Sequence, residues 1–270
     1  MYEPFVVYES PAFLVLYKPP FMHTVPLGSG GTSLLDWCVK RYPCLSRVRG
    51  KTDRDGGMLH RLDRETRGLV LAARTQEAFE NLKRQQEEDR IVKTYGALLV
   101  PPLSALPGFP PLPPGLAGIF PPADRFCVES AFRAYGPGRK AVRPVAAVSP
   151  GGKGRVYRTT ILAAEQADGT MFRRKCIYAK LSLTRGFRHQ IRCHMAWLGF
   201  PIAGDTVYGG GDAALGAIGG GVTNSGVANS GAAEKPALAL KAQGLSFLDP
   251  ENGAPRDFFI PPLIEDYRRA

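Results

Sequence analysis

The sequence predicts an α+β fold, a single domain over residues 1–270 built on a mixed, largely antiparallel central sheet flanked by helices and loops. Two observations favour this class. Apolar runs of strand length outnumber segments with helical periodicity. Predicted strands and helices are interspersed along the chain, and no internal repeat is present. The composition, with 44% hydrophobic and 22% charged residues, is typical of a globular chain and excludes a disordered or fibrous one.

Two strands and a helix are expected near the N-terminus. Residues 5–20 contain two apolar runs separated by a turn-forming Ser-Pro pair, which predicts two short strands. Residues 33–42 have apolar side chains at helical spacing, and Thr32 or Ser33 precedes them as a capping residue. This pattern predicts a capped helix.

A strand, a helix and another strand are expected next. The run at 68–74 has the length and composition of a buried strand. Residues 75–90 begin with a capping threonine and have a narrow apolar face, which predicts a helix. Residues 91–100 predict a strand whose period of two places Lys93 and Tyr95 on one face.

The second half of the chain continues this mixture. Residues 125–161 alternate weakly and are mostly basic, which predicts strands and hairpins on a binding face. A clear strand is expected at 175–186, followed directly by a helix over 189–200 with an apolar stripe. A last strand is expected at 238–250, before a short tail.

Two segments interrupt the predicted elements. The proline-rich residues 101–122 predict a stiff loop or insertion, and the Gly/Ala-rich residues 209–233 predict a flexible surface insertion. The charge-free stretch at 97–123 contains nine prolines, which a membrane-spanning helix could not accommodate. The sequence therefore predicts a protein without a membrane partner.

Cysteine usage and the N-terminus both indicate a reducing compartment. The five cysteines are scattered and form no CxxC pair, so reduced and mostly buried thiols are expected. The N-terminus lacks the basic and apolar regions of a secretory signal. We expect a cytoplasmic protein.

The net charge points to a polyanionic partner. The chain has 35 Lys and Arg against 24 acidic residues, which gives a formal net charge of +11. A surface of that sign attracts nucleic acid, although a solvated excess of charge is the alternative explanation.

The stretch HRLDRETRG at residues 60–68 places one carboxylate, Asp63, among arginines. An ionised carboxylate in a loop before a strand can be a nucleophile, a general base or a metal ligand. Asp63 can equally be the structural ion-pair partner of Arg61 or Arg64. The local pattern leaves both interpretations open.

A second basic cluster lies at the expected strand-to-helix junction. Residues 171–204 contain seven Lys or Arg and no acidic residue. Arg188 and Arg192 are four apart, so on one helix face they would repel unless an anion lay between them. A helix N-terminus would add backbone donors for a phosphate. The sequence therefore predicts an anion site formed by Arg185, Arg188, His189, Arg192 and His194.

Metal and nucleotide sites find little support. There is no HExxH, GxGxxG or GxxxxGK[ST] pattern. Packed or hydrogen-bonded side chains are the simpler expectation for His60, His189 and His194.

Three separated segments resemble the RluA-type pseudouridine synthases. HRLDRETRGLVL resembles the family signature HRLD-x-x-T-S-G, and VKTYGALL resembles its K-x-Y strand motif. RGFRHQIRCHMAWLGFPIAGDTVYG is similar to its block G-R-x-H-Q-I-R-x-H…L-G-x-P-I-x-G-D-x-x-Y-G. A Lys-Pro segment before them and a closing strand after them also match, so the resemblance extends from about Tyr8 to about Asn252.

The resemblance implies a pseudouridine-synthase-like catalytic domain that isomerises uridine in ribosomal or transfer RNA without a cofactor or metal. It places the catalytic carboxylate at Asp63 and the tyrosine that packs against the target base at Tyr95. It places the arginine that holds the flipped nucleotide at Arg61. A monomer without a separate N-terminal RNA-binding domain is expected. Further RNA contacts are expected from Arg64, His60, Arg185, His189 and Arg192.

The sequence departs from the family pattern at three positions. Phe187 stands where the family has the arginine that pairs with the catalytic carboxylate, and we hypothesise that Arg188 supplies the missing charge. Arg67 replaces a serine in what the motif suggests is a surface turn. Lys241 replaces a histidine in the closing strand.

Two rival functions remain open. Phe187 favours a non-catalytic RNA-binding or ribosome-assembly protein with the same fold, whereas the presence of Asp63 and Tyr95 argues against it. A nuclease or glycosidase would need a second carboxylate or a metal cluster. Only Asp205 is a candidate for that role, and we expect it to fix a turn or an arginine instead.

Overall fold

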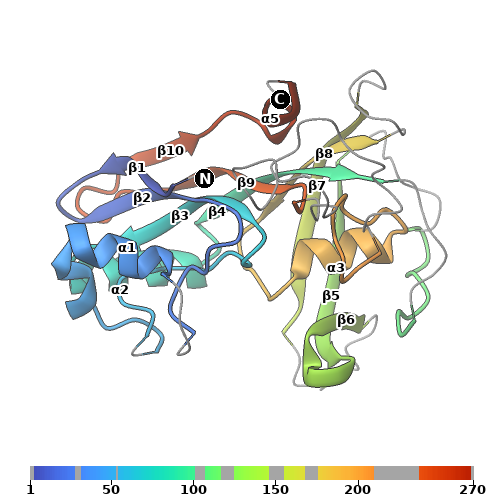
Figure 1. Ribbon diagram of the computed structural model, residues 1–270, viewed down its shortest axis with the longest axis horizontal. Coiled ribbons are helices and arrows are strands. Elements are labelled where there is room, and N and C mark those ends of the chain that lie inside the picture. Colours follow the sequence, from blue (N-terminus) through green and yellow to red (C-terminus); the bar gives the residue numbers. More distant parts are fainter. Residues whose placement is uncertain are drawn as a thin grey trace, which may run out of the picture. The chain divides into compact units, whose positions relative to one another are not determined.

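The computed structural model describes residues 3–27, 32–52, 54–100, 107–116, 125–145, 155–167, 176–209 and 237–268 (Figure 1). The chain divides into two compact units. The first contains Met1–Lys93 and Lys241–Ile260, and the second contains Thr94–Leu240 and Pro261–Ala270.

The first unit is built on a mixed sheet with the strand order β1-β2-β3-β9 and with β10 paired to β9. All its neighbouring strands are antiparallel except β3 and β9, which are parallel. The predicted pair of N-terminal strands is confirmed, as is the strand after the HRLD motif. The bounds are β1 Phe5–Glu9, β2 Phe13–Lys18, β3 Arg67–Ala73, β9 Leu240–Leu248 and β10 Pro255–Phe259.

Two capped helices belong to this unit, as the sequence predicted. Helix α1 (Leu34–Arg41) begins at Ser33, whose hydroxyl accepts from the Asp36 amide while the Asp36 carboxylate accepts from the Ser33 amide. A short 3₁₀ helix, Pro43–Arg47, follows α1. Helix α2 (Gln76–Glu87) begins at Thr75, whose hydroxyl accepts from the Ala78 amide. Its buried side chains pack with β2, β3 and β9 in a core that includes Phe13, Leu69, Leu71, Phe79, Leu82 and Phe247.

Gly68 allows β3 to approach β9 closely. Its φ is +126°, and a Cβ at this position would lie 2.1 Å from the carbonyl oxygen of Ala242. No other residue fits such an approach. The glycine that ends the HRLDRETRG stretch is therefore required by the packing of the two strands behind the Asp63 loop.

The second unit contains a sheet with the order β4-β8-β7-β5-β6. The pairs β5–β6, β5–β7 and β7–β8 are antiparallel. The predicted strands and hairpins are confirmed here. The bounds are β4 Val92–Leu99, β5 Phe126–Tyr135, β6 Ala141–Val145, β7 Tyr157–Gln166 and β8 Ile177–Leu183, with a 3₁₀ turn at Pro137–Arg139.

Nearly every residue of helix α3 (Gln190–Trp197) is buried. Its apolar residues form the expected core stripe, with Ile191 at 4% and Met195 at 0% exposure. Its polar residues are buried as well, which the stripe did not predict. They are Gln190, Arg192 and His194.

The described part of the proline-rich stretch, residues 107–116, is attached to the second unit. Trp197 donates its indole N–H to the Pro110 carbonyl at 2.9 Å, and the Arg143 guanidinium lies 4.3 Å from the Phe109 ring centre. The predicted Gly/Ala-rich insertion lies, apart from Gly209, outside the described residues.

Two C-terminal elements were not predicted. The sequence suggested only a tail after β9, but β10 pairs along β9 from Pro255 to Phe259, and α5 follows at Leu263–Arg268. The exposed and half-buried side chains of β10 give no continuous apolar run, so no pattern marked it as a strand.

Within the described ranges, none of the helices is long and apolar enough to cross a membrane.

Candidate active site

Asp63 lies in a loop of the first unit, immediately before β3. Its side chain is half-buried, and its backbone carbonyl accepts from the Thr66 amide at 3.0 Å, closing a tight turn. The preceding residue, Leu62, is buried. A carboxylate on a short loop supported by a buried strand is held in a restricted position, which a catalytic group requires.

Arg61 and Arg64 extend from the same loop and are both exposed. The Arg64 guanidinium lies over the Phe21 ring, 5.6 Å from its centre. The loop therefore presents two arginines to solvent next to one half-buried carboxylate. This arrangement can attract a phosphate backbone.

His60 supports the start of this loop. Its Nε2 accepts from the Leu71 amide at 3.2 Å, and burial together with the charges of Lys93 and Lys51 holds its pKa well below its ordinary value. The ring is therefore neutral and bonded to β3. His60 therefore supports the loop from inside, and its expected contact with RNA stays a prediction.

Tyr95 belongs to the second unit, on β4, and is 7% exposed. Lys93, two residues earlier, is also buried, and burial lowers its pKa to about 8, as does Lys51, while Asp89 raises it. Every residue of β4 from Lys93 to Leu99 is buried, so burial does not distinguish one face of this strand from the other.

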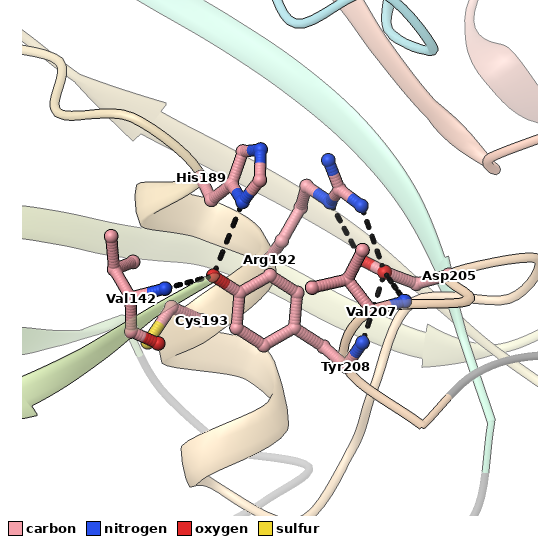
Figure 2. A network of polar contacts seen from close by, with 7 residues as sticks. All are labelled: Val142, His189, Arg192, Cys193, Asp205, Val207 and Tyr208. Carbon is pink, nitrogen blue, oxygen red and sulfur yellow. Dashed lines mark hydrogen bonds and ion pairs between the residues drawn. The ribbon is translucent and has the colours of Figure 1, made fainter. Parts of the chain in front are cut away.

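A network of polar contacts surrounds the start of α3 in the second unit (Figure 2). His189 adopts a left-handed conformation with φ +57° and caps the helix. Its Nδ1 lies 3.2 Å from the Tyr208 hydroxyl, which accepts from the Val142 amide at 2.9 Å. The Tyr208 hydroxyl thus bridges the Val142 amide and the His189 ring. His189 therefore joins α3 to β6 through Tyr208.

Arg192 is buried in the same network and makes a two-point ion pair with Asp205 (Figure 2). Its Nε donates to Oδ2 at 2.7 Å and its Nη2 to Oδ1 at 2.9 Å. Asp205 Oδ1 also accepts from the amides of Val207 and Tyr208. The expectation that Asp205 fixes a turn and an arginine is confirmed. Arg192 does not share a helical face with Arg188, because Arg188 precedes the helix, and its expected contact with RNA stays a prediction.

His194 is completely buried and forms a defined hydrogen-bond chain. The Gln190 side-chain amide donates to the Arg158 carbonyl and the Thr159 hydroxyl. The Thr159 hydroxyl also lies 2.8 Å from His194 Nδ1, and the Ser130 hydroxyl lies 2.9 Å from His194 Nε2, so both ring nitrogens have a hydrogen-bond partner. Burial lowers the pKa of His194 to about 3, so the ring is neutral and does not bind an anion.

Phe187 lies in an aromatic cluster of the second unit. Its ring stacks on Phe132, with centres 5.0 Å apart and planes 4° apart, and meets Tyr157 at 5.1 Å. The next residue, Arg188, is exposed, and its Nη2 donates to the carbonyl of Arg139 at 2.7 Å and of Ala141 at 3.4 Å. Arg185 is half-buried.

Arg67 and Lys241 are neighbours across β3 and β9. They are paired in the strand register and are only 2% and 4% exposed. The expectation of a surface turn at Arg67 is therefore wrong, because Arg67 begins a buried strand. The two departures from the family pattern in these strands lie directly opposite each other.

The structure thus collects the predicted residues into two groups. His60, Arg61, Asp63 and Arg64 share one loop of the first unit, whereas Tyr95, Arg185, Arg188, His189 and Arg192 belong to the second. Among the described residues, no three His, Cys, Asp or Glu side chains gather as metal ligands would.

The comparisons with known proteins agree with these motifs. The profile of a family described as RNA pseudouridylate synthase matches residues 12–197. Ribosomal large subunit pseudouridine synthase D of Pseudomonas aeruginosa is 28% identical over 206 residues, which are 76% of this chain and 53% of that protein. An uncharacterized RNA pseudouridine synthase of Bacillus subtilis is 27% identical over 210 residues, or 78% of this chain and 59% of that protein.

The chain belongs to the RNA pseudouridylate synthase family. A solved structure of human RNA pseudouridylate synthase domain containing 1 shares its fold, with a TM-score of 0.59 and 21% identity over 96% of this chain and 83% of that one. The predicted fold class is confirmed. The chain spans little more than half the length of the curated relatives described above.

Proposed function

We propose that this protein isomerises specific uridines in RNA to pseudouridine, with Asp63 as the catalytic carboxylate. The observation that supports this most is the placement of Asp63: a half-buried carboxylate in a tight loop between exposed Arg61 and Arg64, inside the segment matched by the family profile. A charged group on a restricted loop is suited to covalent chemistry on a nucleotide.

The reaction requires few groups because its atoms balance within one nucleotide. The bond between uracil N1 and ribose C1′ breaks, the base turns, and a bond forms between C5 and C1′. The hydrogen on C5 is lost to solvent, and N1 gains a proton. Asp63 acts by a transient covalent bond to the sugar or the base, and the uridine must leave the stack to reach it.

Two further residues are assigned to the flipped nucleotide. Tyr95 packs against the target base, and Arg61 helps to hold the nucleotide out of the stack. Arg64 and Arg185 contact the RNA backbone, where arginine binds phosphate strongly. The net charge of +11 supports a polyanionic substrate.

Arg188 is proposed to supply the positive charge that the family arginine would provide at Phe187. Its guanidinium is exposed and only one nitrogen, Nη2, is used in the two carbonyl contacts with the β5–β6 hairpin. A guanidinium has five N–H donors, so others are available for an anion.

The proposed substrate is structured ribosomal RNA, with transfer RNA as the alternative. A relative from Pseudomonas aeruginosa is named for the large ribosomal subunit, which supports the first choice. We further propose a monomer that acts in the cytoplasm. All five cysteines are free thiols, as expected in a reducing compartment.

Nucleoside analysis tests the activity. Ribosomal and transfer RNA lacking modifications are incubated with the protein, digested and separated by chromatography. We expect pseudouridine to appear in ribosomal RNA with the wild type and not with Asp63→Asn. An absence of pseudouridine in both RNAs with folded wild-type protein would contradict the proposal.

One observation favours a second candidate, a non-catalytic RNA-binding protein with the same fold. Phe187 is packed against Phe132 and Tyr157, so the position of the family arginine is filled by an aromatic cluster. The same experiment separates the two functions, because this candidate would bind RNA without producing pseudouridine.

A further inference from the structure

Thr24 holds the residue before Asp63 by two hydrogen bonds. Its hydroxyl donates to the Leu62 carbonyl and accepts from the Leu62 amide, both at 3.1 Å. Thr24 and Leu62 are 3% and 8% exposed, so water does not compete effectively for these two hydrogen bonds. One side chain thus satisfies both backbone groups of the residue that leads into Asp63.

Lys18 holds the residue after Asp63. Its ammonium donates to the carbonyls of Pro19 at 2.9 Å, Met22 at 2.8 Å and Arg64 at 3.3 Å. An ammonium has three N–H donors, and here all three have an acceptor. Lys18 is completely buried at the end of β2, so this contact lies under the loop and not on its surface.

The turn between Lys18 and Thr24 is itself constrained. Phe21 has φ +64°, a conformation that is costly for a bulky side chain. The strain is tolerated because the turn directs two carbonyls to the Lys18 ammonium while the Phe21 ring lies beneath the Arg64 guanidinium. We call residues 18–24 the anchor segment.

The anchor segment is attached in turn to α1. The amides of Leu34 and Leu35, at the start of the helix, donate to the carbonyls of His23 at 2.8 Å and Thr24 at 3.1 Å. Free amides at a helix N-terminus need such acceptors. The position of the Asp63 backbone is therefore connected through Thr24 to a helix of the core.

We infer that Lys18 and Thr24 are positioning residues that fix the Asp63 carboxylate by holding the backbone on both sides of it. Neither side chain needs to contact the RNA. This inference rests on the proposed function of Asp63, since a fixed carboxylate matters for turnover only if it reacts. A small displacement of a reacting group is enough to reduce turnover strongly.

The electrostatics around Lys18 agree with this geometry. Burial lowers the pKa of Lys18, Asp63 and Glu65 raise it and Arg64 lowers it, and together these effects leave the pKa at about 7. The charges of Lys18 and Asp63 therefore stabilise each other in the native loop. Since burial opposes the charge, its retention depends on the three carbonyls and the two nearby carboxylates.

Thr24→Val tests the inference, because valine keeps the shape of threonine and removes both hydrogen bonds to Leu62. We expect kcat to fall at least about tenfold while KM for the RNA changes less than about threefold, since RNA contacts are unaffected. Thr24→Ser retains the hydroxyl and should restore kcat to within about threefold of wild type. Hydrogen exchange of the Leu62 amide should be faster in Thr24→Val and restored in Thr24→Ser.

Thr75→Val is the matched control. It removes a threonine hydroxyl that caps α2 and accepts from the Ala78 amide, so it costs stability without touching the Asp63 loop. We expect its kcat and its Leu62 exchange to equal those of the wild type. Lys18→Met should also lower kcat, with a larger loss of stability because three buried carbonyls lose their donor.

The result that overturns the inference is wild-type kcat in Thr24→Val under conditions in which Asp63→Asn is inactive. Unchanged Leu62 exchange in Thr24→Val would overturn it as well. If Asp63→Asn retained full turnover, the proposed role of Asp63 would fail instead, and the exchange experiment would still decide whether Thr24 holds the loop.

Discussion

Arg192 and Asp205 form a two-point ion pair inside the second unit, and their side chains are only 3% and 0% exposed. Breaking such a pair leaves one charge buried without compensation. Asp205 also accepts hydrogen bonds from the backbone amides of Val207 and Tyr208. The pair therefore fixes the turn that follows Ile202, a residue bridged to the end of β4. Arg192 therefore has a buried structural partner although it lies in a basic motif.

The first prediction concerns the stability that this pair provides. Asp205→Asn should lower the free energy of unfolding by about 3–5 kcal/mol, because the buried Arg192 guanidinium would lose the negative charge of the Asp205 carboxylate. Urea unfolding measures this. Glu129→Gln is the control, since the Arg158–Glu129 pair is exposed and its loss should cost less than about 1 kcal/mol. Equal losses in both variants would contradict the structural role of the buried pair.

The second prediction is a loss of stability in acid that depends on His194. The folded protein keeps the pKa of His194 at about 3, whereas the unfolded chain has the ordinary value of 6.5. Between these values the unfolded chain binds a proton that the folded one does not, so stability is complete above 6.5 and falls as the pH decreases towards 3.

The expected size at pH 4.5 is about 2–3 kcal/mol relative to pH 7. Urea unfolding at the two pH values measures it. His194→Gln should be less stable at pH 7 but should lose less stability on acidification than the wild type. The remaining dependence includes His60, whose pKa is also lowered. An identical pH dependence in His194→Gln would be evidence against this account.

The elements that the sequence predicted correctly have strong local patterns. The caps at Ser33 and Thr75 mark the starts of α1 and α2, apolar runs mark β2 and β3, and alternating apolar and polar side chains mark β8. By contrast, β10 is short, begins with proline and exposes alternate side chains. Its only identifying feature is its pairing with β9, which no local pattern reveals.

The candidate site could be predicted only in part, because contacts between distant segments leave no local pattern in the sequence. Asp63 and its arginines stand together in the sequence, so the motif identifies them. The contacts that hold the loop come from Lys18 and Thr24, 46 and 38 residues away from their partners Arg64 and Leu62. A side chain bonded to distant backbone groups leaves no pattern in the sequence.

Burial of polar groups was the other source of error. Arg67 was expected in a surface turn, and Arg192 was expected beside Arg188 in an anion site at a helix N-terminus. Both are buried, one in the register with Lys241 and the other in the ion pair with Asp205. Such positions depend on pairing between elements, which the helical or strand period of one element does not determine.

The third prediction concerns the close approach of β3 to β9. Gly68→Ala should lower the free energy of unfolding by more than about 3 kcal/mol, because the new Cβ would lie 2.1 Å from the Ala242 carbonyl oxygen and at a positive φ. Gly253→Ala is the matched control. It also has a positive φ, of +71°, but nothing within 4 Å, so only about 1 kcal/mol is expected. Thermal unfolding measures the loss of stability in both variants. Equal losses would contradict the prediction, because they would show that β3 and β9 do not need the close approach at Gly68.

The fourth prediction concerns Arg188. If it supplies the charge that Phe187 cannot, Arg188→Ala should abolish turnover as completely as Asp63→Ala does. Arg185→Ala should instead weaken RNA binding and raise KM, since this variant loses a proposed contact with the phosphate backbone of the RNA. Single-turnover kinetics with saturating enzyme separate the two effects. Retained turnover in Arg188→Ala would remove this residue from the reaction.

The most direct measurement of the central claim is tritium release from RNA labelled at uracil C5, made in parallel with RNA binding. Isomerisation must expel the C5 hydrogen, whereas binding alone does not. We predict release by the wild type and none by Asp63→Asn, with equal RNA affinity for both. Release by Asp63→Asn at the wild-type rate, or none by wild-type protein that binds the RNA, would contradict the assignment of Asp63 as the catalytic carboxylate.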